Sequence, residues 1–110
     1  EWYLKKAEEV FLEIFERLYE KIYPSRKIKP KISIKKMKTR WGSCNKKLNR
    51  INLNLKLIHQ PLVCIEYVIT HELIHLMHPN HSKKFYNMLE VVMPDYKSKK
   101  KMLNSILVYI

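Results

Sequence analysis

Apolar side chains recur every three or four positions over residues 4–22 of the chain. This spacing places them on one face of an amphipathic helix, and Pro24 then ends that helix. Further along, Ile32 and Ile34 alternate with polar neighbours, as in a strand with one buried face. The beginning of the chain therefore predicts a long helix followed by a strand that runs toward Arg40.

A second alternating stretch, at residues 51–55, predicts another strand. The turn-forming residues 42–49 lie between the two strands and indicate a hairpin-like, antiparallel pair with an irregular loop. Gly42 is the only glycine in the chain. We therefore expect tight turns to use asparagine, which tolerates a positive φ better than most residues.

Two more helices are expected after the strands. Pro61 suits the first position of a helix, and an apolar stripe continues from there to His78. Pro79 ends this helix because the residue before a proline is pushed out of the helical region. Ser82 is a good N-cap for a following helix that reaches about Val92.

A last helix is expected over residues 96–109, after a break at Pro94. Four helices with one small sheet define an α+β domain, and 110 residues of which 46% are apolar suffice for one core. We expect this domain to span residues 1–110. Because the chain begins with Glu1 rather than Met, an upstream domain or targeting segment stays open.

Two features restrict the class of protein further. Apolar runs are far shorter than the roughly 18–20 residues that a membrane-spanning helix needs, so no membrane is expected among the partners. The two cysteines, Cys44 and Cys64, are too few for a disulfide framework. A reducing, cytoplasmic location is therefore expected.

Basic residues are concentrated in residues 21–60, which carry ten Lys, three Arg and no acidic residue, within a net charge of +12 for the chain. This charge permits nucleic acid or a nucleotide as a partner. However, the segment is richer in lysine than in arginine, which binds phosphate better in bidentate geometry. No aromatic ladder accompanies the lysines, as stacking on single strands would need. A solvated, lysine-rich surface is the simpler interpretation.

Four of the five histidines lie within residues 71–81, and this segment begins with H-E-x-x-H. On a helix, His71 and His75 lie about 40° apart around the axis and roughly 6 Å apart along it, so both imidazoles can bind one metal ion. Glu72 is turned by about 100° from His71. It can instead accept a proton from a metal-bound water. A helix surface that is merely rich in histidine is less favoured, because the apolar stripe independently predicts the helix that the motif requires.

A mononuclear catalytic zinc site takes three protein ligands and keeps one position open, and His78 and His81 compete to be the third ligand. On a continuous helix His78 would lie about 10 Å along the axis from His71, too far for Zn–N bonds near 2.0–2.1 Å. A break at Pro79, with Asn80 in the left-handed conformation, would carry His81 back toward the metal and leave His78 at the rim. We therefore expect the zinc ligands to be His71, His75 and His81.

The segment Trp41-Gly42-Ser43-Cys44 offers a hydroxyl and a thiol as candidate nucleophiles. A nucleophile needs a base that is itself oriented by a third group. The available histidines are better explained as metal ligands. A tight turn with Trp41 packed under the sheet is the simpler interpretation of this segment.

Three strings of sequence, MKTRWGSCN, RINLNLKLI and YVITHELIHLMHPNHSKKF, make the chain resemble the YgjP-like family of predicted zinc hydrolases. That family is related to the SprT- and Wss1-type metallopeptidases of the minimal zincin fold. The matching strings span residues 37–85. The resemblance implies that the H-E-x-x-H helix packs with other helices under a small antiparallel sheet. It also implies zinc at His71, His75 and His81 and a catalytic Glu72.

Together these observations favour a zinc-dependent hydrolase, and first of all a metallopeptidase in which Glu72 activates a zinc-bound water. Its substrate would be a peptide or protein that lies extended along a free edge of the sheet. Two alternatives stay open, a metal-dependent nucleoside triphosphate pyrophosphatase and a basic nucleic-acid-binding module with structural zinc. Substrate specificity and oligomeric state do not follow from the sequence. The candidates for stabilising an oxyanion are Asn54, Tyr67, Tyr86 and Tyr96.

Overall fold

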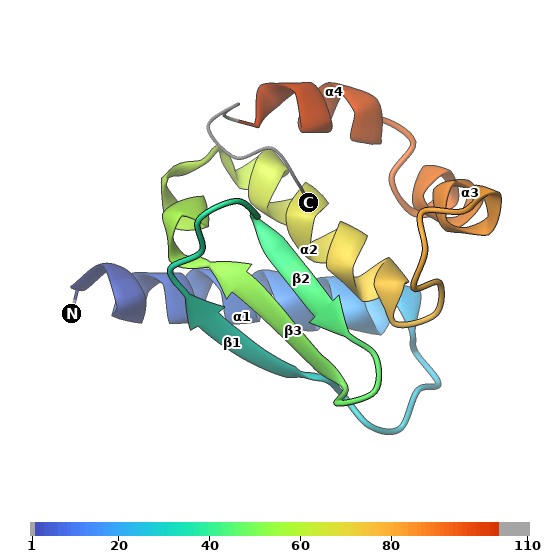
Figure 1. Cartoon of the computed structure of the whole chain (residues 1–110), viewed down its shortest axis with the longest axis horizontal. Coiled ribbons are helices and arrows are strands. Elements are labelled where there is room, and N and C mark those ends of the chain that lie inside the picture. The colour runs from blue at the N-terminus through green and yellow to red at the C-terminus, as the bar shows by residue number, and fades with distance from the viewer. Residues whose placement is uncertain (1, 104–110) are drawn as a thin grey trace.

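The computed structural model describes residues 2–103, which form four α-helices, one 3-10 helix and three strands (Figure 1). In chain order the elements are α1 (Trp2–Ile22), β1 (Lys31–Lys35), β2 (Gly42–Asn45), β3 (Arg50–Asn54), η1 (Leu55–His59), α2 (Leu62–His75), α3 (Lys83–Val92) and α4 (Tyr96–Met102). The helix that carries H-E-x-x-H is α2. The predicted α+β class is confirmed.

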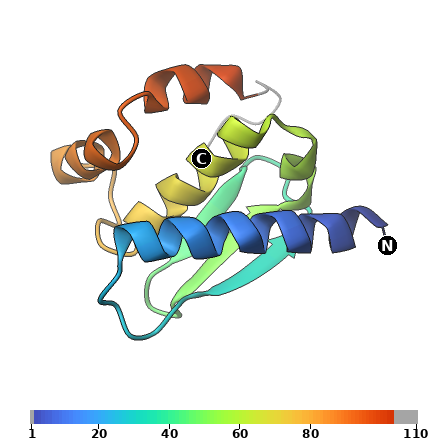
Figure 2. The same cartoon turned by 180° about the vertical axis from the view of Figure 1, so that it is seen from behind.

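Helix α1 crosses behind the sheet, on the same side as α2 (Figures 1 and 2). Its predicted apolar stripe is buried along most of its length and half-buried at Leu4 and Ile22, and the helix ends just before Pro24, as predicted. Beyond this end the buried Tyr23 hydroxyl donates a 2.6 Å hydrogen bond to the carbonyl of Leu73 in α2. This bond ties the end of α1 to the helix that carries the histidines.

The sheet is mixed, with strand order β1-β3-β2, and the prediction of an antiparallel sheet is wrong. Strand β1 runs parallel to β3, with Ile32 beside Ile51, whereas β2 runs antiparallel to β3, with Cys44 beside Ile51. The hairpin is therefore made by β2 and β3 rather than by the two strands predicted from apolar alternation. Alternation identifies a strand and its buried face, but it does not give the direction of its neighbour.

Strand β2 occupies positions that the sequence predicts to be loop. The residues it turns toward the helices are Gly42 and Cys44, whose small side chains produce no apolar alternation. The turn from β2 to β3 ends at Asn49, which has a φ of 52° and is the only non-glycine residue with a positive φ among residues 2–103. The expected use of asparagine in a tight turn is thus confirmed, but at Asn49 and not at Asn80.

The core lies between the sheet and the helices. Ile51 and Leu53 of β3 are fully buried and belong to one apolar cluster with side chains of α1 and α2. Trp41 is 3% exposed and belongs to the same cluster, as predicted. This packing sets β2 against α2 and so fixes the distance between the strand and the H-E-x-x-H motif.

Helix α2 ends at His75, whereas the sequence predicts a helix that reaches His78. The carbonyl of Leu73 accepts hydrogen bonds from the Tyr23 hydroxyl and from the backbone N–H three residues ahead. Because these contacts replace the usual bond to the fourth residue ahead, the helix tightens and stops one turn before Pro79. The chain therefore leaves the helix directly after the second histidine of the motif.

Helix α3 begins as predicted, with Ser82 as its N-cap, because the Ser82 Oγ accepts a 3.4 Å hydrogen bond from the N–H of Phe85. Both α3 and α4 pack against α2. The predicted last helix starts as expected at Tyr96 but ends at Met102, where Leu103 is already extended, so the prediction of one helix over residues 96–109 is wrong. Residues 104–109 lie outside the described residues. None of the described helices is long and apolar enough to cross a membrane.

Candidate metal centre

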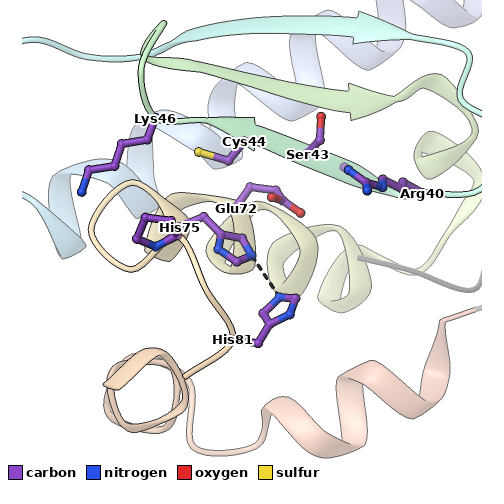
Figure 3. Close-up of a pocket in the computed structure, with 9 residues that line it drawn as sticks. Arg40, Ser43, Cys44, Lys46, Glu72, His75 and His81 are labelled. Atoms are coloured by element: carbon purple, nitrogen blue, oxygen red, sulfur yellow. Dashed lines mark hydrogen bonds between the residues drawn. The ribbon is translucent and has the colours of Figure 1, made fainter. Parts of the chain in front are cut away.

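Three histidines come together where α2 ends and the chain turns toward α3. Figure 3 shows two of them, His75 and His81. His71 and His75 are separated by one turn of α2, and His81 lies in the connection to α3. One ring nitrogen of each lies within 4.8 Å of those of the other two. The structure thus brings together the three residues that the sequence predicts as ligands, and it does so without a left-handed residue at Asn80.

The ring of His75 is held in a defined orientation. Its Nδ1 lies 3.0 Å from the backbone carbonyl of His78, which can only accept, so Nδ1 carries the proton and donates it. The lone pair is then on Nε2, which lies 3.0 Å from Nε2 of His81. Metal-binding histidines are commonly fixed by such a bond from their second nitrogen. His78 thus acts through its backbone, and its side chain lies outside the three-nitrogen cluster.

Burial favours the neutral form of all three imidazoles. It lowers the pKa of His71 to about 4, and it also lowers the pKa of His75 and that of His81. A histidine binds a metal ion through the lone pair of its neutral ring. Each of the three rings is therefore neutral at neutral pH and has one lone pair with which it can bind a metal ion.

Phe85 forms the apolar floor of the cluster. This fully buried residue of α3 lies with its ring centroid 4.9 Å from that of His71, 4.6 Å from that of His75 and 5.0 Å from that of His81. The sequence pattern alone does not distinguish Phe85 from other apolar residues. The available signal is its place three residues after the N-cap Ser82, where an apolar side chain begins the buried face of α3.

Glu72 lies beside the histidines, between α2 and β2, with 1% of its surface exposed. Its Oε2 is 3.4 Å from Nδ1 of His71, and neither atom has a hydrogen-bond partner within the described part of the chain. Burial raises the pKa of Glu72 to about 7, against the lowering effect of His75, His81 and Arg40. The site therefore holds a buried carboxylate with an oxygen still able to accept a proton.

Gly42 makes room for this carboxylate. A Cβ at this position would lie 3.1 Å from Cγ of Glu72, 3.3 Å from its Oε2 and 3.1 Å from the carbonyl of Asn52. These separations are shorter than ordinary van der Waals contacts, so a side chain here would push against Glu72. The only glycine of the chain serves this close approach, because its φ is not positive.

A cleft of about 290 Å³ separates β2 from the end of α2 (Figure 3). It is lined by Arg40, Gly42, Ser43, Cys44, Lys46, Glu72, His75, Pro79 and His81. Burial and the charge of Glu72 raise the pKa of the Cys44 thiol to about 12, so this cysteine is protonated at neutral pH. The cleft therefore contains a carboxylate and histidines as its reactive groups.

Strand β2 forms an outer edge of the sheet built by the described residues. The N–H of Asn54 donates a 2.9 Å hydrogen bond to the carbonyl of Trp41, and hydrogen-bonded pairs alternate along an antiparallel ladder. It follows that Gly42 and Cys44 direct their N–H and C=O groups away from β3. The edge that borders the cleft thus offers backbone donors and acceptors.

The candidate oxyanion donors are not equally placed. Asn54 is fully buried, and its amide donates to the carbonyls of Met37 and Arg40 at 3.0 and 2.8 Å, so it holds the loop before β2 instead. Tyr67 is 2% exposed and belongs to the core. Tyr86 is 37% exposed, and its ring centroid lies 6.2 Å from that of His81.

Two solved structures share this fold. The metallopeptidase zymogen abylysin of Pyrococcus abyssi is 22% identical, with a TM-score of 0.72 over 83% of this chain and 89% of that chain. The metallopeptidase zymogen jannalysin of Methanocaldococcus jannaschii is 24% identical, with a TM-score of 0.70 over 83% of this chain and 90% of that chain. The fold is that of a minimal zincin, as the sequence resemblance implies.

Residues 1–106 match the family described as YgjP-like, metallopeptidase domain. Because this match covers nearly the whole chain, the protein belongs to the YgjP-like family of metallopeptidases. The family resemblance noted from three short strings is thereby confirmed. No curated protein sequence matches the chain.

Proposed function

We propose that the protein is a zinc peptidase in which His71, His75 and His81 bind the metal and Glu72 is the general base. The observation that carries this proposal is the convergence of three histidine nitrogens within 4.8 Å beside a buried carboxylate. Structural zinc sites are closed by four protein ligands, whereas catalytic sites use three. A set of three histidines, two of which line a cleft, therefore supports a catalytic site.

The donor set suits zinc. Neutral imidazole nitrogens are common zinc ligands, and two of them on one tetrahedral ion at 2.0–2.1 Å lie about 3.4 Å apart. The Nε2 atoms of His75 and His81 are 3.0 Å apart, which is compatible with this separation. Zinc bound here would supply a Lewis acid that lowers the pKa of water and polarises the scissile carbonyl.

The residues of the chain would move and hold the protons. A carboxylate oxygen of Glu72 takes a proton from the attacking water as the new C–O bond forms. It then gives that proton to the departing amine nitrogen as the peptide C–N bond breaks. The missing side chain at Gly42 leaves the room that the carboxylate occupies during both transfers.

The substrate would lie along the outer edge of β2. Gly42 and Cys44 present backbone N–H and C=O groups there, and an extended peptide can pair with such an edge as an added strand. This pairing places the substrate backbone in the cleft between β2 and the histidines. Because the bonds join backbone groups, they hold a peptide independently of its side chains.

The Glu72→Gln variant tests this proposal. We expect it to retain one zinc per chain, measured by elemental analysis, and to lose turnover of casein and of a fluorogenic peptide by about 10²–10⁴-fold, because the amide cannot accept the proton. Glu90→Gln, which changes an exposed carboxylate of α3 in the same way, should keep full activity. Undiminished turnover by Glu72→Gln would end the general-base assignment.

The same assay addresses the kind of substrate. Wild-type protein, with and without chelator, is given peptides and, in parallel, nucleoside triphosphates. We expect chelator-sensitive cleavage of peptides. Hydrolysis of the triphosphates without cleavage of any peptide would overturn the proposed peptidase function.

A further inference from the structure

The cleft carries two cationic side chains, Arg40 and Lys46, near the two ends of β2 (Figure 3). Neither forms an ion pair with a residue in the described range 2–103, whereas surface cations such as Arg17 and Lys29 do. Among the described residues, the only acidic one that lines the cleft is Glu72, which is 1% exposed. Both cations are therefore available to a ligand in the cleft.

Glu72 of α2, whose pKa burial raises and Arg40 lowers in part, is the carboxylate that faces this charge in the cleft, and the segment that carries both cations adds no other. All three strands and both cations belong to residues 21–60, which hold 13 basic residues and no acidic one. A cleft in which positive charge predominates attracts negatively charged ligands. The potential in the cleft thus favours a negatively charged substrate on each side of the histidines.

We propose that the cleft selects acidic peptides, with Asp or Glu on both sides of the scissile bond. This inference rests on the proposed function, because it specifies the peptide that the same site cleaves. Arg40 and Lys46 are six positions apart in a nearly extended segment, a span of up to about 20 Å. A substrate strand paired with β2 therefore meets the two cations with residues about six positions apart.

The solvent exposure of Arg40 and Lys46 limits how much an acidic substrate residue can raise kcat/KM. Both cations are exposed, so solvent and salt screen their contacts, and an exposed ion pair contributes little. We expect each matched acidic residue to raise kcat/KM about fivefold, and we expect this gain to shrink as ionic strength rises. Two acidic residues together should give about 25-fold at low salt.

A nucleic acid would use a different set of residues. Lys47 and Arg50 are exposed and basic, but they do not line the cleft. A polyanion lying over the basic segment would contact them as much as Arg40 and Lys46. These two residues therefore provide matched controls that separate selection inside the cleft from general attraction of anions.

The test uses fluorogenic peptides of equal length that carry Glu on the amino side, the carboxyl side, both sides or neither, with Gln as replacement. The measured quantity is kcat/KM of a Glu peptide divided by kcat/KM of the matching Gln peptide. Arg40→Gln should lower this ratio about fivefold for peptides with Glu on one side of the scissile bond. Lys46→Gln should lower it by the same factor for peptides with Glu on the other side. Lys47→Gln and Arg50→Gln should leave every ratio unchanged.

Binding provides a second measurement. A fluorescein-labelled peptide with Glu on both sides should bind Glu72→Gln more tightly than its Gln counterpart, and adding Arg40→Gln should reduce that difference about fivefold. Equal kcat/KM for acidic and neutral peptides overturns the inference. An equal loss of this ratio in Lys47→Gln or Arg50→Gln also overturns it. So does displacement of the peptide by single-stranded DNA if Lys47→Gln or Arg50→Gln weakens that displacement. If wild-type protein cleaves no peptide at all, the proposed function fails, and the binding comparison still decides the inference.

Discussion

Gly42 and Glu72 depend on each other at the scale of single residues. The carboxylate reaches the face of β2 only because its neighbour there has no side chain. The backbone conformation does not require a glycine, since the φ of this residue is not positive. Alanine at this position would thus test the contact itself, free of any effect of left-handed geometry.

Replacing Gly42 with alanine should displace Glu72 and reduce kcat at least tenfold, with unchanged zinc content. The added methyl group should also cost about 1–3 kcal/mol of unfolding free energy, as overpacking does. Kinetics, metal analysis and denaturant unfolding measure these effects. In a Glu72→Ala background the same change should destabilise the protein less, because Cγ is gone. Full activity of Gly42→Ala would contradict the positioning role.

The roles of His81 and His78 can be separated by one pair of variants. His81→Ala removes a ring nitrogen from the cluster and should weaken zinc binding at least tenfold. His78→Ala keeps the backbone carbonyl that accepts from His75 and should leave zinc affinity within about threefold. Competition with a chromophoric chelator measures both affinities. The reverse result would exchange the two assignments.

At the scale of elements, the N-terminus of α3 places both His81 and Phe85. The capping bond from the N–H of Phe85 to Ser82 is long, at 3.4 Å, so its contribution lies toward the low end of such caps. Losing it should nevertheless loosen the turn that holds the third histidine.

Ser82→Ala should therefore reduce stability by about 0.5–1 kcal/mol and weaken zinc binding severalfold. Thermal unfolding and chelator competition measure the two effects. Ser98→Ala is the matched control, since it removes a hydroxyl from α4, far along the chain from the cluster. If both variants bind zinc equally well, the start of α3 does not position His81.

Some elements could be predicted from the sequence and others could not. The difference is whether an element is formed by residues close together in the sequence or by residues far apart. Helix α1 and the H-E-x-x-H motif follow from spacing within a few turns, so the sequence alone shows them. Strand β2 is not predicted because its inward positions hold only Gly42 and Cys44, which give no apolar alternation. The early end of α2 depends on Tyr23, 50 residues away from Leu73, and such a contact leaves no local pattern.

The same distinction holds within the site. The three histidines lie in one short segment and could be predicted as a group. The fit of Glu72 against Gly42 joins two distant segments, and it follows from the packing of β2 on α2. Read locally, Gly42 indicates only a turn.

At the scale of the whole molecule, the candidate ligands all lie in residues 71–81. A metal bound there closes a short loop and links the end of α2 to the start of α3. Closing a short loop removes little entropy from the unfolded chain. The core between α1, α2 and the sheet is built from apolar side chains other than the three histidines, which it meets at Phe85 and Tyr67. The fold should therefore survive without metal.

Chelation should leave the protein folded and lower the melting temperature by several degrees, since a ligand bound only to the native state adds stability. Hydrogen exchange should become faster in α3 and the connection before it, and stay unchanged in α1 and β3. Mass spectrometry of exchanged peptides measures this pattern. Complete unfolding on chelation would contradict it.

Strand β2 is only four residues long, and two of these turn their peptide groups outward. So short an edge can pair with a single segment of polypeptide that is already unfolded and extended. A helix or hairpin brought to it already has its own amides and carbonyls satisfied. Well-folded proteins would then pass the enzyme intact, and cutting would be confined to tails, open loops and partly denatured chains.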